Sequence, residues 1–263
     1  MSPALELVLK ATVLLTLALF LEAVVLRRAS GKLKHSVWCA TLFALALLPL
    51  TLLAPPFLAV AVPEARVSAN PTSPLTPAGR GDNKEVPLIP PVGRGMGGGK
   101  FPWEHLLILG YFVGMGGLLL RLLLDRALLF RLARRATLAS PIHFPCDFSV
   151  HLSPAVPTPL AAGGRVGVLL PDSAHAWSAE RRHVILLHEA THLRRRDHIT
   201  LPVALALQAL WWFHPLVWLA VIRFRATAEA ACDEAVVAAG VSPSTYAEHL
   251  LETAKSLKLE TAV

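Results

Sequence analysis

Three long apolar stretches dominate the first half of the chain. Residues 5–26 carry charges only near their ends, residues 36–62 carry none, and residues 103–124 are uncharged from Leu106 to Leu120. A helix needs about 20 apolar residues to cross the hydrocarbon core of a bilayer. The pattern therefore predicts three transmembrane helices. Because no basic residue precedes the first stretch, it is expected to remain a membrane helix and not to be a cleaved signal peptide.

Basic residues follow the first and the third of these stretches, at Arg27–Lys34 and Arg126–Arg135. Positively charged loops stay on the cytoplasmic side, so both ends are expected there and the N-terminus outside. The segment between the second and third stretches is rich in proline and glycine, which is typical of a flexible loop. The predicted division is 1–62 for two transmembrane helices, 63–102 for an external loop, 103–124 for the third helix and 125–263 for a cytoplasmic domain.

From Phe144 onward, long apolar segments give way to prolines, glycines and short alternating runs. Apolar residues alternate over 148–152, and residues 166–170 are apolar and rich in β-branched side chains. Both patterns predict short strands, for which we expect a small antiparallel sheet. A helix should then begin at Ser178, a good N-cap residue. The expected fold class is a mainly α membrane protein, with three transmembrane helices and a cytoplasmic α+β domain.

Candidate chemistry is concentrated in this last helix, in the run L-L-H-E-A-T-H-L-R-R-R-D at 186–197. His188 and His192 are four residues apart, so on a helix both imidazoles project from one face. Two neutral imidazoles in this arrangement can hold one zinc ion. Glu189 follows the first histidine, as the general base does in the H-E-x-x-H signature. The pattern predicts metal-assisted hydrolysis of a peptide bond.

The uncharged segment 199–222 is long enough to be a fourth crossing. However, arginines at 194–196 precede it and Arg223 follows it, so both of its ends are expected on the cytoplasmic side. We therefore predict a bent pair of helices, broken near His214 and Pro215 and either buried in the domain or dipping into the membrane. This return would bring the following helix back to the histidines.

A catalytic zinc ion needs a third protein ligand and an open position for water. Glu229 and Asp233 lie four apart on the returning helix and share a face. We assign Glu229 as the third ligand and Asp233 as the partner of a ligand imidazole through its other ring nitrogen. His198 and His214 are expected to be structural. Spacing does not rank Tyr246, His175 and His214 as groups that would stabilise the oxyanion.

Composition supports a membrane location. Hydrophobic residues make up 54% of the chain, above the usual 45–50%, and the mean hydropathy is +0.53. The net charge of +7 comes with basic clusters at the ends of apolar segments. These clusters are typical of membrane anchors, and no direct binding of nucleic acid is expected. The three cysteines, Cys39, Cys146 and Cys232, form no C-x-x-C pair and predict no disulfide framework.

Three motifs together resemble one known family. They are H-E-A-T-H-L-R-R-R-D at 188–197, F-H-P-L-V-W at 213–218 and A-E-A-A-C-D-E at 228–234, after three amino-terminal crossings. The chain is similar in these residues to the BlaR/MecR-type membrane zinc peptidases. The resemblance implies a gluzincin fold facing the cytoplasm, with Zn²⁺ on His188, His192 and Glu229 and with Glu189 as general base. The implied substrate is a protein, such as a transcriptional repressor.

In the best-known members of that family, an external penicillin-binding sensor follows the peptidase. This sequence ends at Val263 without such a sensor, so we expect either a truncated or minimal member or a signal that arises elsewhere, and we carry over no antibiotic sensing. Two alternatives stay open. One is an HtpX-like or CAAX-type membrane protease, and the other is a non-catalytic signalling or scaffold protein that retains the zinc fold. The lipid bilayer is an expected partner, and a homodimer is left open.

Overall fold

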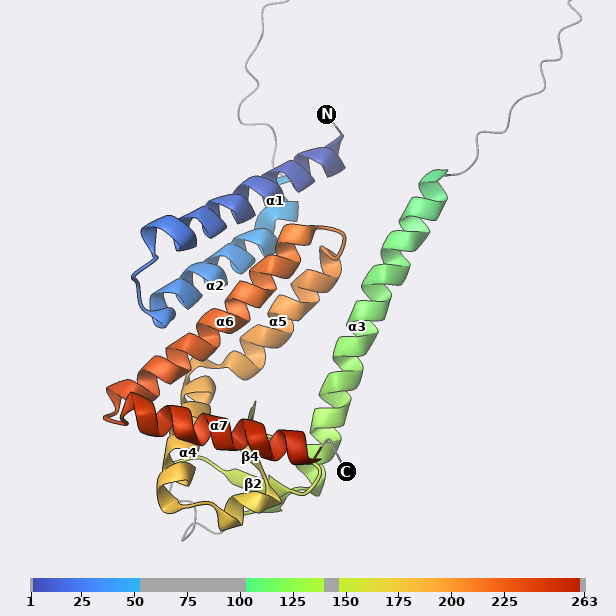
Figure 1. Ribbon diagram of the computed structural model, residues 1–263. Coiled ribbons are helices and arrows are strands. Elements are labelled where there is room, and N and C mark those ends of the chain that lie inside the picture. The colour runs from blue at the N-terminus through green and yellow to red at the C-terminus, as the bar shows by residue number, and fades with distance from the viewer. Residues whose placement is uncertain (1, 53–102, 140–146, 261–263) are drawn as a thin grey trace, which may run out of the picture.

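The computed structural model describes residues 2–52, 103–139 and 147–260, and Figure 1 shows their arrangement. Helix α1, Pro3–Phe20, continues into a π-helical turn at Leu21–Val25, and helix α2, Gly31–Leu47, ends in a 3₁₀ turn at Leu48–Leu52. Helix α3 spans Trp103–Arg135. Within the described residues, these three helical segments are long and apolar enough to cross a membrane. The chain is a membrane protein, as its sequence predicted.

One predicted crossing continues beyond its expected end, and part of another lies outside the described residues. The last part of the second predicted crossing, residues 53–62, lies outside the described residues, as does the predicted external loop at 63–102. Helix α3 passes through Leu124 without a break and continues to Arg135. Its last third therefore reaches the sheet, where α3 contacts β2. The division at residue 125 stays a prediction.

The predicted return of the chain is present. Helix α5, Asp197–Leu210, is followed by a turn and by helix α6, Pro215–Ala238, which runs back beside it (Figure 1). Pro215 is the first residue of α6, where its missing N–H breaks no hydrogen bond of the helix. The break expected near His214 and Pro215 is thus confirmed. The apolar segment 199–222 forms two antiparallel helices instead of one span.

The sheet is mixed, which corrects the expected antiparallel sheet. Its four strands are β1, Thr137–Leu138, β2, Val150–Ser153, β3, Leu160–Gly163, and β4, Gly167–Pro171, in the order β1-β2-β4-β3. Strand β4 pairs in parallel with β2, whereas the other two pairings are antiparallel. Strand β3 lies at the edge of the sheet and is joined to β4 by a tight turn. Strand β4 therefore lies between β3 and β2 and runs in the same direction as β2.

Gly167 explains why β4 can lie so close to β2. Its φ angle is +66°, a left-handed conformation that glycine adopts without strain. A Cβ atom at this position would also lie 2.2 Å from the carbonyl oxygen of Ser149. Only glycine fits at this point of the sheet.

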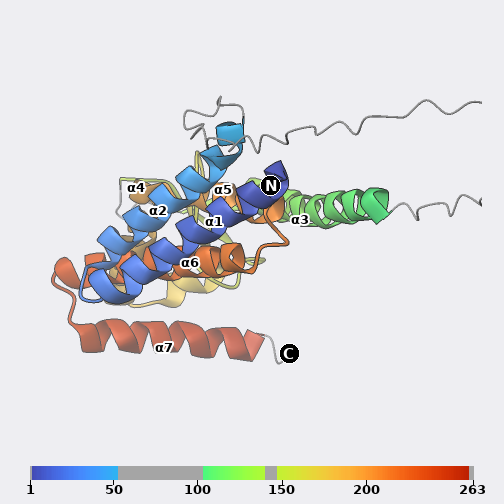
Figure 2. The ribbon, with the colours of Figure 1, turned by 90° about the horizontal axis from the view of Figure 1, so that it is seen from above.

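The four helices α1, α2, α5 and α6 share one apolar core. Helix α5 itself contributes the buried Ala204, and the largest buried side chains come from α1, α2, α6 and the turn after α5: Leu15, Trp38, Leu45, Trp211, Val217 and Phe224. A second core lies between the sheet and helix α4, Ala179–Arg195. Helix α7, Pro243–Glu260, runs along one side of the molecule, away from α2 (Figure 2). Tyr246 of α7 packs against α4 and α6.

A buried carboxylate joins the N-terminal helices to α6. Glu22 is only 4% exposed and accepts a hydrogen bond from the indole nitrogen of Trp38 at 3.0 Å. Its two oxygens also accept from Nε and Nη2 of Arg223 at 3.0 and 2.6 Å. A buried charge is tolerated when it is paired and hydrogen-bonded in this way. The pair therefore links the π-helical turn after α1 to the middle of α6.

The N-terminus of α2 is also held by α6. The backbone N–H of Gly31 donates to both carboxylate oxygens of Glu234, at 2.7 and 2.8 Å. A Cβ atom on Gly31 would lie 2.7 Å from the backbone nitrogen of Ala231, so the two helices meet backbone to backbone. A carboxylate at a helix N-terminus also interacts favourably with the helix dipole.

We expect Glu22→Ala to lower the free energy of unfolding by about 2 kcal/mol, because it leaves the buried Trp38 indole without an acceptor. Glu22→Gln should cost less, since its amide oxygen can still accept that bond. The measurement is thermal unfolding of the full chain in detergent, followed by tryptophan fluorescence. Glu6→Ala is the matched control, because Glu6 pairs with Lys10 on the exposed surface. Equal destabilisation by Glu22→Ala and Glu6→Ala would contradict the structural role of Glu22.

Candidate metal centre

Helix α4 carries the two histidines and is positioned at both ends. The Ser178 hydroxyl accepts a hydrogen bond from the backbone N–H of Arg181 at 3.1 Å, which confirms the predicted N-cap. The helix ends at Arg196, which has a φ angle of +62°. Ile185 and Leu186 are buried against the sheet. His188 and His192 then face α6, whose return brings Glu229 toward them.

Three ligand atoms from these two helices converge. The Nε2 atoms of His188 and His192 are 3.1 Å apart, and Oε2 of Glu229 lies 3.5 and 3.6 Å from them. We call these three atoms the donor triangle. The structure thus brings together the three residues that the sequence predicted as metal ligands.

The donor triangle has the dimensions of a zinc site. With tetrahedral bonds of about 2.0–2.2 Å, neighbouring ligand atoms lie roughly 3.3–3.6 Å apart. The two separations from Glu229, 3.5 and 3.6 Å, fall in this range, and the separation of the two imidazole nitrogens, 3.1 Å, is slightly shorter. Two imidazoles and one carboxylate are also the donor set of a catalytic zinc site, which keeps its fourth position open. The residues present therefore fit the metal that the motif implies.

Each histidine is oriented through its other ring nitrogen. Nδ1 of His188 lies 2.8 Å from the Tyr246 hydroxyl and 3.3 Å from Oδ1 of Asp233. The same hydroxyl donates to Asp233 at 2.6 Å. Nδ1 of His192 lies 2.8 Å from Oδ2 of Asp197. Acidic partners of this kind fix the ring and its tautomer and leave Nε2 free for a metal.

The sequence suggested Asp233 for this supporting position but missed Asp197 and the contact of Tyr246. Asp197 follows His192 by five residues, across the left-handed end of α4 at Arg196, so helical spacing gives no signal for it. Arg195 holds Asp197 by donating from Nε to Oδ2 at 3.2 Å. The signal in the sequence is an aspartate five residues after the second histidine and two residues after an arginine.

One of the N-terminal helices also reaches this network. His35 of α2 is buried, and its Nε2 lies 3.9 Å from Oδ1 of Asp197. Its Nδ1 lies 3.3 Å from the carbonyl oxygen of Phe224 on α6. The second helix of the chain therefore packs directly behind the residue that orients His192.

The acidic side chains around the donor triangle shift the pKa values of its three residues. Burial lowers the pKa of His188, but its contacts with Asp233 and Glu229 outweigh burial and raise the pKa to about 9. Burial also opposes the charged form of His192, yet Asp197, Cys232 and Glu229 raise its pKa to about 12. The two imidazoles in turn hold the pKa of Glu229 far below its usual range. A cluster that favours positive charge so strongly beside a carboxylate is suited to a divalent cation.

Glu189 lies next to the triangle in a protected position. It is 8% exposed, and burial raises the pKa of its carboxyl, while the charges of His188 and His192 act in the opposite direction. The backbone of Ala161, in the edge strand β3, is close enough to lower the pKa of this carboxyl. A buried carboxyl with a raised pKa beside a metal site is suited to accept and return a proton.

A cleft of about 240 Å³ leads to this site. Strand β3 forms one wall through Leu160 and Ala161, and α5 forms another through Leu201 and Pro202. Helix α3 contributes Arg126, which sequence reasoning had read only as part of a membrane anchor. The cleft therefore joins an open strand edge to the donor triangle.

A second set of metal-binding side chains overlaps the first. His192, Asp197 and Cys232 also bring their ligand atoms within 4.8 Å of one another. However, Asp197 is already bound by Nδ1 of His192 and by Arg195, and Cys232 is fully buried. The first set opens to the cleft, so it is the better metal site.

The cleft distinguishes the remaining histidines and the candidates for stabilising the oxyanion, because only some of them line it. None of Tyr246, His175 and His214 lines the cleft. Nε2 of His214 instead lies 3.0 Å from the Thr12 hydroxyl of α1, at the turn between α5 and α6. His198 does line the cleft, as does Arg126, and each has a buried nitrogen without a hydrogen-bond partner in the described part of the chain.

Two comparisons with known proteins bear on the class of this protein. Residues 142–262, a little under half of the chain, match the family Peptidase_M56, described as BlaR1 peptidase M56. The chain is also 33% identical over 86 residues to the regulatory protein BlaR1 of Bacillus licheniformis. Those residues are 32% of this chain and 14% of that protein. Both comparisons support a BlaR/MecR-type peptidase family for this part of the chain, the family that the sequence resembles.

We expect Asp197→Ala to weaken zinc binding by about 10- to 100-fold, because His192 loses the partner that orients its ring. The measurement is a competition titration of the purified full chain against a zinc chelator. Asp172→Ala is the matched control, since Asp172 is an exposed aspartate in the 3₁₀ turn at Asp172–Ala176. Equal zinc affinity of Asp197→Ala and wild type would contradict the role of this carboxylate.

Proposed function

We propose that this protein is a membrane-embedded zinc endopeptidase that cleaves a regulatory protein, such as a transcriptional repressor, on the cytoplasmic side. The observation that supports this most directly is the donor triangle of His188, His192 and Glu229, with its zinc-like separations beside the buried carboxyl of Glu189. The family supports a metallopeptidase in a membrane protein, and its BlaR1 relative is named a regulatory protein.

His188, His192 and Glu229 would hold the zinc ion through Nε2, Nε2 and Oε2. When bound, zinc acts as a Lewis acid that makes water a strong nucleophile near neutral pH. Glu189 accepts a proton from the attacking water and returns it to the nitrogen of the leaving peptide. Asp197 and Asp233 hold the two rings in register, and Arg126 and His198 offer donors toward the cleft for the developing oxyanion.

The cleft favours an extended polypeptide as substrate. Strand β3 is at the edge of the sheet, and its Leu160 and Ala161 line the cleft. An edge strand presents unpaired backbone groups with which an extended peptide can form a further strand. A substrate bound in this way would run beside Glu189, which the Ala161 backbone contacts.

We expect Glu189→Gln to slow peptide hydrolysis by about 10²- to 10⁴-fold, since it removes the general base. Its zinc content should stay at one ion per chain, because Glu189 is not in the donor triangle. The measurement pairs cleavage of candidate substrates with metal analysis of the purified protein. Glu180→Gln, on the exposed first turn of α4, is the control.

The substrate can be sought by comparing the proteomes of cells that carry the wild-type chain and Glu189→Ala. A regulator that accumulates uncut only in the variant supports the signalling role. Accumulation of many damaged membrane proteins would favour an HtpX-like quality-control protease. If Glu189→Gln left the cleavage of every candidate unchanged, a non-catalytic scaffold would be the better description.

The proposed topology has the N-terminus outside and the metal centre in the cytoplasm, in line with the basic residues that follow the first and third apolar stretches. We expect a cysteine at position 196 to react with a membrane-impermeant maleimide only after the cells are opened. A cysteine at position 82 should react in intact cells. Both tests use a chain whose native cysteines are replaced by serine. Labelling of position 196 from outside would overturn this orientation.

A further inference from the structure

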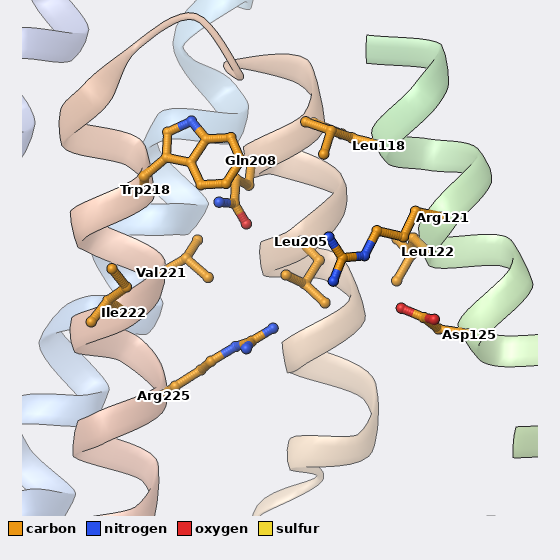
Figure 3. Close-up of a pocket in the computed structure, with 11 residues that line it drawn as sticks. Leu118, Arg121, Leu122, Asp125, Leu205, Gln208, Trp218, Val221, Ile222 and Arg225 are labelled. Carbon is orange, nitrogen blue, oxygen red and sulfur yellow. The ribbon is translucent and has the colours of Figure 1, made fainter. Parts of the chain in front are cut away.

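A second cavity, away from the donor triangle, lies where α3 faces α5 and α6. Its volume is about 290 Å³, and its walls include charged and apolar side chains (Figure 3). Arg121 and Asp125 come from α3, Gln208 from α5, and Trp218 and Arg225 from α6. None of these five residues takes part in the chemistry proposed above.

The two arginines enter this cavity from opposite walls. Figure 3 shows the guanidinium groups of Arg121 and Arg225 directed into the space between the helices. Within the described residues, neither group has a hydrogen bond or an ion pair, although Asp125 is one helical turn from Arg121. Two cations and one carboxylate give the cavity a net charge of +1. Like charges that converge beside apolar walls favour the binding of an anion.

The cavity is also polarised along its length. Arg225 and Asp125 lie at one end in Figure 3, and Trp218 and Leu118 lie at the other. Trp218 precedes Arg225 by seven residues, which corresponds to roughly 10 Å along a helix. A ligand that fits this distribution has an anionic group at one end and an apolar part at the other.

The position of Arg121 relates this cavity to the membrane. It follows Trp103 by 18 residues on the continuous helix α3, a rise of roughly 27 Å, close to the thickness of a bilayer's hydrocarbon core. With Trp103 at one interface, Arg121 therefore lies at the level of the other. The outer surfaces around the cavity are apolar, since Leu120, Leu124 and Ile222 are more than half exposed. The cavity thus opens toward lipid.

We propose that this cavity binds the headgroup of an anionic glycerophospholipid. Arg121 and Arg225 donate to the phosphate, and the carboxylate of Asp125 and the amide of Gln208 bind the hydroxyl groups of a glycerol headgroup. The acyl chains leave past Trp218 along the apolar surface of α6. One negative charge balances the net charge of the cavity, and the volume suits a headgroup better than a whole lipid.

The test is native mass spectrometry of the full chain, released from detergent in the presence of phosphatidylglycerol, phosphatidylethanolamine or phosphatidylcholine. We expect the wild type to retain phosphatidylglycerol at least tenfold better than either zwitterionic lipid. Removing each arginine should weaken this retention by about tenfold, as expected for the loss of a charge-assisted hydrogen bond. The double variant Arg121→Gln and Arg225→Gln should therefore lose the preference.

The matched control is the double variant Arg27→Gln and Arg28→Gln, which removes the same charge from the exposed connection between α1 and α2. It should retain phosphatidylglycerol like the wild type. Arg121→Lys keeps the charge and should keep most of the preference, which separates a binding role from a folding defect. Equal retention of all three lipids by the wild type would overturn the proposal. So would an equal loss of the preference in the two glutamine double variants.

Discussion

The carboxylate of Glu229 on α6 lies beside the ring nitrogens of His188 and His192 on α4, and this contact determines the path of the chain around the site. The chain leaves the histidines along α5, reverses at residues 211–214 and returns along α6 to Glu229. The two apolar helices made in this way need a partner for their buried faces, and α1 and α2 supply it. The same packing brings His35 of α2 close to Asp197 and Gly31 onto Glu234. The membrane helices are thus part of the support of the metal centre.

Local patterns in the sequence predicted the parts of this site that lie on one helix. The spacing of His188 and His192 and the N-cap at Ser178 depend only on helical geometry, and both are present. The return at Pro215 was predictable because charges at both ends of an apolar segment exclude a simple crossing. Asp197 escaped prediction because it is reached across a left-handed residue, and His35 because it lies far away in the sequence. The parallel pairing of β2 and β4 depends on the turn that places β3 outside, which strand patterns alone do not encode.

The two imidazoles are held in different ways. Asp197, at the start of α5, orients His192 and is held by Arg195 beside it, so this half of the support is local. His188 depends on Asp233 of α6 and Tyr246 of α7, which come from more distant parts of the chain. Helix α7 therefore contributes to the geometry of the centre through the hydroxyl group of Tyr246, although none of its described side chains lines the cleft.

The pairing of Glu22 with Arg223 has a consequence for the order in which the protein assembles. A chain is synthesised from its N-terminus, so the carboxylate and Trp38 reach the membrane while the ribosome has still to make α6. Until then, the indole is the acid's only partner among those seen in the finished structure. Arg223 and Glu229 belong to the same helix and arrive together. The buried pair of Glu22 and Arg223 and the candidate metal centre are therefore both completed only once α6 has been made.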